Sequence, residues 1–285
     1  MKPYYITEEF LQSFIRSALR EDVGEGDHST LASIPSEKQG KAQLLVKDRG
    51  ILAGVDLAIE IFKQFDSTLD VQVNQMDGAL VVPGDVAFVV RGSIRSVLTT
   101  ERLVLNCMQR MSGIATCTNR LVKLVEGTKA RLLDTRKTTP NFRLFEKWAV
   151  RIGGGENHRI GLFDMIMLKD NHIDMAGGIT QAIIRTKEYL RAINKQLKIE
   201  VEARSLKEVE EALLIDGVDV IMLDNMSLKD MTEAVRRVNG KCKTEASGGI
   251  TEETISSVAE CGVDYISVGA LTHSVRSLDL SLKVF

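Results

Sequence analysis

Lys198-Ile-Glu-Val-Glu-Ala203, Asp219-Val-Ile-Met-Leu-Asp224, Cys242-Lys-Thr-Glu-Ala-Ser247 and Asp264-Tyr-Ile-Ser-Val-Gly269 are the segments of the chain that say most about its architecture. They begin 21, 23 and 22 residues apart. This spacing fits one strand, one helix and two short loops, and such alternation is typical of a parallel sheet. We therefore predict that each segment is a strand of one sheet and is connected to the next strand by a helix.

Two further apolar segments precede these four, at 131–134 and at 163–168. Between the later strands, Ser205-Leu-Lys-Glu208 has the spacing of a capping box, Ser227 precedes a second helical stretch, and Thr251 precedes a third. The whole set predicts about six parallel strands with crossover helices. The simplest such fold is an α/β barrel, either complete or incomplete.

The first hundred residues lack this period and predict an α+β domain. Turns separate four apolar runs that read as strands, at 43–47, 50–54, 69–73 and 79–90. One helix is predicted over about 55–65, and a longer one over about 99–125 with an interruption at Ser112-Gly113. We place an N-terminal α/β sandwich domain at 1–112 and the barrel at 113–273, and we expect the tail 274–285 to pack on the first domain.

Composition limits the class of protein. A net charge of -2 and an isoelectric point near 6.2 give no support to nucleic-acid binding. The sequence has no apolar run of the roughly 18 residues that a membrane span needs, and its polar, acidic start does not resemble a signal peptide. The four cysteines have neither metal-ligand spacing nor close pairing. We therefore expect a cytoplasmic protein with reduced thiols.

Basic side chains gather around two of the predicted strands. Arg136 and Lys137 follow 131–134, while His158 and Arg159 precede 163–168 and Lys169 follows it. Parallel barrels carry their functional groups at the C-terminal ends of the strands. A single arginine or lysine at such a place is commonly a solvated loop charge. A local set of cations in a chain of nearly balanced charge instead favours a site for a carboxylate or phosphate ligand.

The later strand ends carry carboxylates and glycines. Glu202 and Asp224 end consecutive strands, where two carboxylates suit Mg²⁺ because this ion leaves its other positions to water and substrate oxygens. The alternative is that either carboxylate pairs with Lys169. The next two strand ends have the pattern of a backbone phosphate cradle, with residues Ser247, Gly248, Gly249, Gly269 and His273.

These residues belong to motifs that resemble those of the quinolinate phosphoribosyltransferases, also called carboxylating nicotinate-nucleotide pyrophosphorylases. The motifs are Asp134-Thr-Arg-Lys-Thr-Thr-Pro140, Gly153-Gly-Gly-Glu-Asn-His-Arg-Ile-Gly-Leu162, Leu168-Lys-Asp-Asn-His172, Glu200-Val-Glu202, Met222-Leu-Asp-Asn225, Glu245-Ala-Ser-Gly-Gly-Ile250 and Gly269-Ala-Leu-Thr-His-Ser274. The N-terminal Glu21-Asp-Val-Gly-Glu-Gly-Asp27 and the Thr100-Glu-Arg-Leu-Val-Leu-Asn106 stretch also match, so the resemblance covers nearly the whole chain.

The resemblance implies an enzyme of de novo NAD biosynthesis. Its substrates would be quinolinate and phosphoribosyl pyrophosphate, and its products nicotinate mononucleotide, pyrophosphate and CO₂. It also implies a homodimer in which the barrel mouth faces the partner subunit's N-terminal domain, so that the active sites are shared. Whether such dimers associate further into a hexamer stays open.

The resemblance further implies roles for individual residues. Quinolinate would be bound by Arg136, His158, Arg159 and Lys169, and by Arg102 from the partner subunit. Mg²⁺ would lie near Glu202 and Asp224, and the ribose 5-phosphate would be held by Ser247, Gly248, Gly249, Gly269 and His273. The catalytic set would comprise Lys137, Lys169, Glu202 and Asp224, with Lys137 near the substrate anions.

Structural alternatives exist for several of these roles. His158 could orient Arg159 without touching substrate, and His172 could support Lys169. Arg102 could pair on the surface with Glu101 or Glu126. At the level of the whole protein, the rivals are a related phosphoribosyltransferase acting on another acidic acceptor, such as the one encoded in molybdate transport operons, and a non-catalytic phosphate-binding barrel.

Overall fold

The computed structural model describes residues 2–285, which form two compact units. The first unit is built from residues up to 119, 138–154 and 271–285. The second is built from residues 120–137 and 155–270. The prediction of an N-terminal α+β domain followed by an α/β barrel domain with six parallel strands is confirmed.

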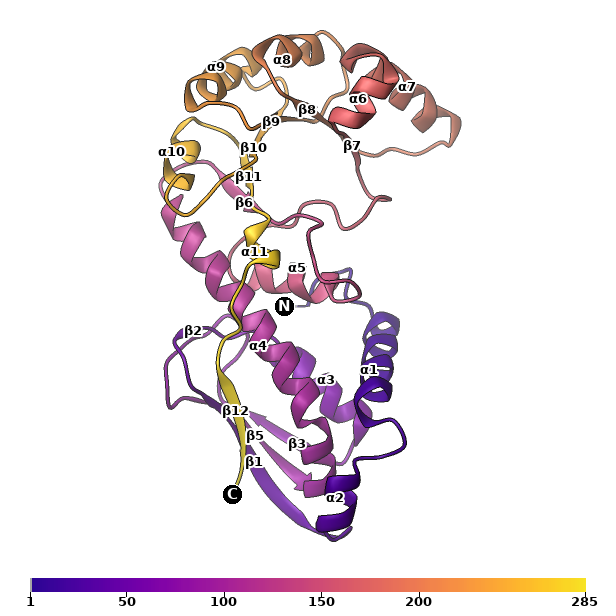
Figure 1. Ribbon diagram of the computed structural model, residues 1–285, viewed down its shortest axis with the longest axis vertical. Coiled ribbons are helices and arrows are strands. Elements are labelled where there is room, and N and C mark those ends of the chain that lie inside the picture. The colour runs from indigo at the N-terminus through magenta and orange to yellow at the C-terminus, as the bar shows by residue number, and fades with distance from the viewer. Residues whose placement is uncertain (1) are drawn as a thin grey trace. The chain divides into compact units, whose positions relative to one another are not determined.

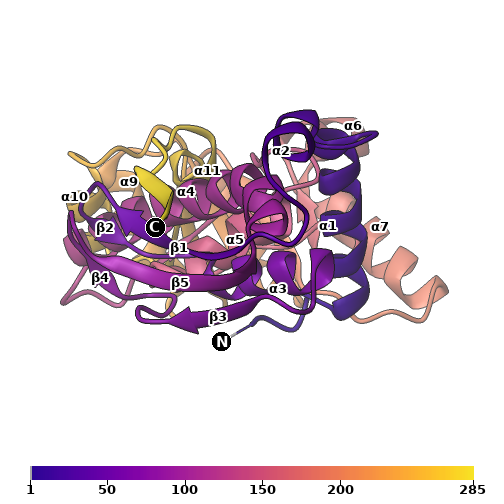
Figure 2. The ribbon, with the colours of Figure 1, turned by 90° about the horizontal axis from the view of Figure 1, so that it is seen from below.

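The first unit contains a four-stranded antiparallel sheet in the order β12-β1-β5-β3 (Figure 2). Its strands are β1 (Gln39–Val46), β3 (Asp70–Val73), β5 (Val86–Ser93) and β12 (Leu280–Val284). Along β1 every second residue from Ala42 to Val46 is buried, which is the period of a strand with one face on a core. β12 pairs with β1, so the C-terminal tail is part of this sheet. A small second sheet joins β2 (Gly50–Ile51) to β4 (Leu80–Val81).

Helices of the first unit are α1 (Glu8–Val23), α2 (His28–Ser33), α3 (Val55–Phe65), α4 (Ile94–Leu124, which continues into the second unit) and α5 (Arg143–Ile152). α1 and α2, which the apolar pattern did not predict, begin at polar caps: Thr7 accepts the N–H of Phe10, and Asp27 accepts that of Thr30. The bounds of α3 agree with the expected 55–65.

The expected interruption of the long helix at Gly113 is wrong, because α4 runs unbroken through this position. The glycine serves close packing instead. A Cβ at Gly113 would collide with the main-chain oxygen of Arg276 in the C-terminal tail. A residue that sequence patterns associate with a break is here required by a neighbouring segment.

Helix α5 packs with the first unit, although the sequence boundary at 112 assigned its residues to the barrel. Phe145 of α5 contacts Phe10 and Phe14 of α1, with ring centroids 5.1 and 4.5 Å apart. Arg110 of α4 donates to the buried carboxylate of Glu146 through Nε at 3.0 Å and Nη2 at 2.9 Å. These contacts with α1 and α4 explain why α5 belongs to the first unit.

The second unit is built on a parallel sheet in the order β6-β11-β10-β9-β8-β7, which forms an arc with helices outside it (Figure 1). Its strands are β6 (Arg131–Leu133), β7 (Ile166–Leu168), β8 (Ile199–Ala203), β9 (Val220–Asp224), β10 (Lys243–Ser247) and β11 (Tyr265–Ser267). Its helices are α6 (Asp170–Ala176), α7 (Ile179–Ala192), α8 (Leu206–Leu213), α9 (Leu228–Val238) and α10 (Ile255–Glu260). The short α11 (Ala270–His273) follows β11.

Two elements of this unit are shorter than predicted. β7 begins only at Ile166, because the carboxylate of Asp164 accepts the N–H groups of Ile160 and Gly161 and closes a turn there. The helix expected directly after Thr251 begins at Ile255. Ser205 and Ser227 cap α8 and α9 as predicted. None of the helices in residues 2–285 combines the length and apolarity that a bilayer crossing requires.

Candidate active site

The C-terminal strand ends of the second unit bring several predicted site residues to one edge of the sheet. Ser247 of β10 lies opposite Asp224 of β9, and Glu202 of β8 lies opposite Met222 of β9. Lys169 directly follows β7 and is the N-cap residue of α6. Adjacent parallel strands therefore present a lysine, two carboxylates and a serine in order around the arc.

Negative charge is crowded at Glu202. Burial raises the pKa of Glu202, and the charges of Asp224 and Asp170 act in the same direction, while Lys169 opposes them. Lys169 is thus one cation beside three carboxylates, those of Glu202, Asp224 and Asp170. An ion pair between Lys169 and one of them would leave the other two charges unneutralised. Such a donor set fits a divalent cation that takes one or two carboxylate ligands.

Lys169 is supported through its main chain. Its N–H donates to Nδ1 of His172 at 3.0 Å, while its side chain is exposed. Lys137 is also exposed, and its N–H donates to Oγ1 of Thr135 at 3.0 Å. Both lysines therefore follow a strand in a locally fixed backbone and extend toward solvent.

Two arginines are close enough to perturb each other. Burial lowers the pKa of Arg159, and the nearby positive charge of Arg136 lowers it further, against the opposing effect of Glu200. Nη1 of Arg159 donates to the main-chain oxygen of Met165 at 3.3 Å. Guanidinium groups held near each other in this way favour an anion between them, since the anion removes their repulsion and accepts paired hydrogen bonds.

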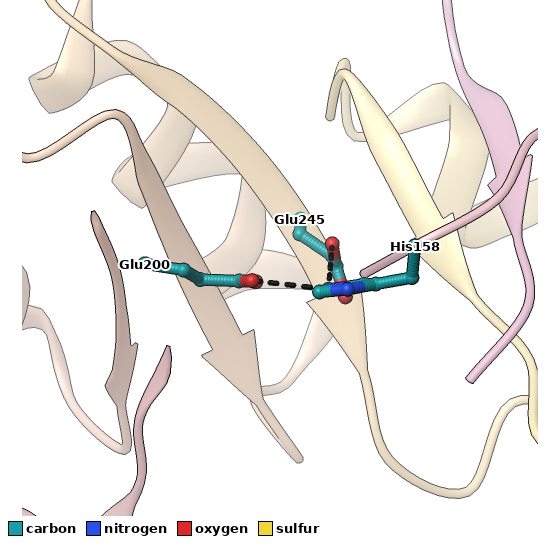
Figure 3. A group of neighbouring side chains, drawn as sticks. All are labelled: His158, Glu200 and Glu245. Atoms are coloured by element: carbon teal, nitrogen blue, oxygen red, sulfur yellow. Dashed lines mark ion pairs between the residues drawn. The ribbon is translucent and has the colours of Figure 1, made fainter. Parts of the chain in front are cut away.

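The ring of His158 faces the carboxylates of Glu200, from β8, and Glu245, from β10 (Figure 3). Its Nε2 is 3.0 Å from Oε2 of Glu200 and 3.4 Å from Oε2 of Glu245. Its Nδ1 accepts the N–H of Arg159 at 2.7 Å. The His158 side chain is only 6% exposed. Both ring nitrogens thus have protein neighbours, and the contact with the Arg159 N–H is compatible with the orienting role that the sequence offers beside substrate contact.

Burial and neighbouring charges act in opposite directions on His158 and Glu200. Burial opposes a charged ring, but the two carboxylates outweigh it and raise the pKa of His158 to about 10. Burial raises the pKa of Glu200 to about 7, which His158 opposes and Glu245 reinforces. A second ring proton would have to sit on Nδ1, which accepts the main-chain N–H of Arg159, so we take the ring as neutral, with its one proton on Nε2, although the carboxylates raise its pKa.

Asp134 fixes the segment that carries His158. Its buried carboxylate accepts the His158 N–H at 2.9 Å and the Asn157 side-chain amide at 2.6 Å. The main chain of Glu156 bridges in parallel to Leu133 of β6, so this segment lies along the edge of the sheet. Sequence reasoning assigned no role to Asp134, Glu200 or Glu245, although all three stand in the quoted motifs.

The glycine loop after β10 has the conformation of a backbone cradle. Gly248 and Gly249 have φ values of +95° and +60°, a region that favours glycine. A Cβ on Gly248 would also collide with the side chain of Asn225. The main-chain N–H of Asn225 donates to the main-chain oxygen of Ser247 at 2.9 Å. The loop can therefore offer main-chain N–H groups to a phosphate.

Two predicted site residues, Arg102 and His273, lie in the first unit. Arg102 is exposed on α4, next to the buried Leu103. His273 is exposed at the end of α11, and its Nδ1 lies 2.6 Å from Oγ of Ser274. The other predicted site residues all belong to the second unit.

Fold and site together define an α/β barrel protein that is equipped to bind carboxylate and phosphate groups beside a pair of acidic side chains. A family model for the N-terminal domain of quinolinate phosphoribosyl transferase matches residues 27–112, and one for the C-terminal domain matches residues 114–283. The chain therefore belongs to the quinolinate phosphoribosyl transferase family.

Relatives share most of their length with this chain. It is 46% identical to a chloroplastic carboxylating nicotinate-nucleotide pyrophosphorylase of Oryza sativa, over 96% of this chain and 77% of the relative. It is 40% identical to a probable carboxylating nicotinate-nucleotide pyrophosphorylase of Bacillus subtilis, over 96% and 93%. The structure of NadC from Streptococcus pyogenes aligns with a TM-score of 0.93 and 43% identity, over 98% of both chains.

Proposed function

We propose that this protein transfers the phosphoribosyl group of phosphoribosyl pyrophosphate to quinolinate, with loss of CO₂, and so forms nicotinate mononucleotide for NAD biosynthesis. The observation that carries the proposal is the pair of neighbouring cations Arg136 and Arg159, in the same barrel unit as Lys169, the two carboxylates and the glycine cradle. Family membership supports the same reaction.

Quinolinate carries two carboxylates on adjacent ring carbons, and the cations of the site suit both. Arg136 and Arg159 can each give a carboxylate two parallel hydrogen bonds, and Lys169 adds a point charge at the next strand end. Each charge-assisted hydrogen bond stabilises the complex by about 1.5 to 3 kcal/mol. We assign the pyridine dicarboxylate to this cationic side of the site.

Glu202 and Asp224 would hold Mg²⁺, and the crowded negative charge at Glu202 fits such an ion. When bound, the ion would supply positive charge for the pyrophosphate group of the substrate. Ser247 and the glycines after β10, with Gly269 after β11, would bind the ribose 5-phosphate through main-chain N–H groups. We propose that His273 contributes to the same phosphate.

The protein's part in the chemistry is positioning and electrostatics. The pyridine nitrogen forms a bond to the sugar carbon as the bond to pyrophosphate breaks, which leaves the ring cationic. The positive charge of the ring stabilises the carbanion left on C2 when the adjacent carboxylate departs as CO₂, so decarboxylation follows ring quaternisation. A proton then adds at C2 to give nicotinate mononucleotide. Arg136, Arg159 and Lys169 hold the acceptor in place through both steps.

We further propose a homodimer in which Arg102 reaches the quinolinate bound in the partner's barrel. The support is that Arg102 is exposed beside buried apolar residues of α4. Association of dimers into a hexamer is left open. We propose the cytoplasm as the compartment, supported by four cysteines that form no disulfide, all of them within residues 2–285.

One incubation tests the reaction: purified protein, quinolinate, phosphoribosyl pyrophosphate and Mg²⁺, with nicotinate mononucleotide measured by chromatography. We expect the product to form at a rate that depends on both substrates, with release of one CO₂ for each product molecule. If a folded preparation forms no product, the proposal fails. Binding of quinolinate without turnover would then favour the non-catalytic barrel, and no binding would favour a different acidic acceptor.

A further inference from the structure

The ring of His158 is held from both sides. Its Nδ1 accepts the Arg159 main-chain N–H, and its Nε2 faces the carboxylates of Glu200 and Glu245 (Figure 3). A neutral imidazole carries one proton, and a nitrogen that accepts a hydrogen bond does not carry it. The ring proton of His158 is therefore on Nε2, directed at the two carboxylates.

The same three side chains have the composition of a metal site, since their ligand atoms lie within 4.8 Å of one another. A histidine that binds a metal through one nitrogen carries its proton on the other and donates it. In His158 the other nitrogen, Nδ1, accepts the N–H of Arg159. A metal at Nε2 would require a proton on Nδ1, and this proton would point at the N–H of Arg159. The arrangement suits a shared proton and not a metal ion.

We propose that Glu200 and Glu245 are positioning residues for quinolinate, because they hold the ring of His158 and the ring holds the main chain of Arg159. The inference rests on the proposed function and deepens it, since it names the groups that place a quinolinate-binding arginine. Neither glutamate is expected to touch substrate. Both act through His158.

The burial of the two glutamates supports this role. Glu200 is 0% and Glu245 1% exposed, and burying two carboxylates is costly unless donors compensate them. They project from β8 and β10, two strands paired on either side of β9, so their positions are set by the sheet. Functional groups supported by strands are placed more precisely than groups on an unsupported loop.

The position of Arg159 needs such support because its guanidinium is close to that of Arg136. Like charges move apart when the backbone allows it. Asp134 fixes the N–H of His158, and the ring of His158 fixes the next N–H along the chain, that of Arg159. Two successive backbone groups are thus tied to the barrel.

The test compares alanine and glutamine variants at the two positions with a control, E260A, which removes an exposed glutamate of α10. We expect E200A and E245A to raise KM for quinolinate by about tenfold or more, the effect of losing one good charged contact, and to leave KM for phosphoribosyl pyrophosphate within about twofold. E200Q and E245Q keep an oxygen that can accept the Nε2 proton, so they should recover most of the loss.

A second measurement does not need catalysis. With ¹⁵N-labelled histidine, NMR should show Nδ1 of His158 unprotonated and Nε2 protonated in the wild-type protein, and a mixed tautomer in the alanine variants. Quinolinate affinity by calorimetry should fall in parallel. A protonated Nδ1 in the wild type, equal rises in both KM values, or alanine variants with unchanged quinolinate affinity would each overturn the proposal. If the alanine variants do not fold, the wild-type tautomer still decides it, even for a protein that makes no nicotinate mononucleotide.

Discussion

Replacing Arg110 by Met should strongly destabilise the protein. The guanidinium donates to Oε1 of Glu146 through Nε at 3.0 Å and Nη2 at 2.9 Å, and also to the main-chain oxygens of Thr272 and Val275. Glu146 is completely buried. Met fills much of the volume but, among the described residues, leaves the carboxylate the hydroxyl and N–H of Thr139 as donors.

The magnitude follows from the uncompensated charge. Breaking a buried ion pair by removing one partner costs about 3 to 5 kcal/mol, and two charged hydrogen bonds lost at about 1.5 to 3 kcal/mol each give a similar figure. We therefore expect R110M to lower the free energy of unfolding by about 3 to 5 kcal/mol. Urea unfolding followed by circular dichroism at fixed protein concentration measures this value.

A double variant separates the charge effect from lost packing. R110M/E146L removes both partners and leaves no buried carboxylate, so it should be more stable than R110M by at least about 2 kcal/mol. The exposed pair Arg120 and Glu252, 3.1 Å apart, provides a matched control, because R120M should cost less than about 1 kcal/mol. A loss below about 1 kcal/mol in R110M, or a double variant no more stable than the single one, would refute the reasoning.

Four further outcomes are expected. Burial raises the pKa of Asp77 to about 6, so the folded state binds a proton more readily than the unfolded state. The free energy of unfolding of the wild type, measured against D77N in paired urea titrations, should therefore rise by about 3 kcal/mol as pH falls from 7 to below 4. E202A and D224A should each lower Mg²⁺-dependent turnover while thermal unfolding stays near wild type, and unchanged metal dependence in steady-state assays would make both carboxylates structural. Nicotinate, which lacks one carboxylate, should be used at least tenfold less efficiently than quinolinate, as comparison of kcat/KM will show. Refolding inactive R102A with inactive K169A should restore up to about a quarter of wild-type activity if sites are shared, whereas verified mixed dimers without activity would place Arg102 in its own chain's site.

Much of the barrel could be predicted because its signals are local. The segments around Ile199–Ala203 and Val220–Asp224 are short apolar runs with regular spacing, and Ser205 and Ser227 cap the helices that follow them. The cation and glycine motifs could likewise be placed at strand ends, because each motif follows an apolar run and the end of that run marks the end of the strand. Charge type and position along the chain then indicated an anion site.

Other features depended on contacts between residues distant in sequence. Gly113 lies within an unbroken helix because Arg276 approaches it, and α5 joins the first unit through Arg110 and Glu146. The alternation of side chains along a strand predicts the face of the sheet on which Glu200 lies but not the residues that it contacts. Its partners His158 and Glu245 come from other segments, and the order of the strands in the sheet places β8 and β10 on either side of β9.

The sequence by itself therefore indicated the alternation of strands and helices in the barrel unit and the chemical class of the ligand, because both follow from periodicity and residue type within short windows. The tertiary structure decided which buried polar groups lie together, which glycine permits close packing, and which main-chain group the ring of His158 contacts. These depend on distances of about 3 Å between segments separated by tens of residues, which no local pattern specifies.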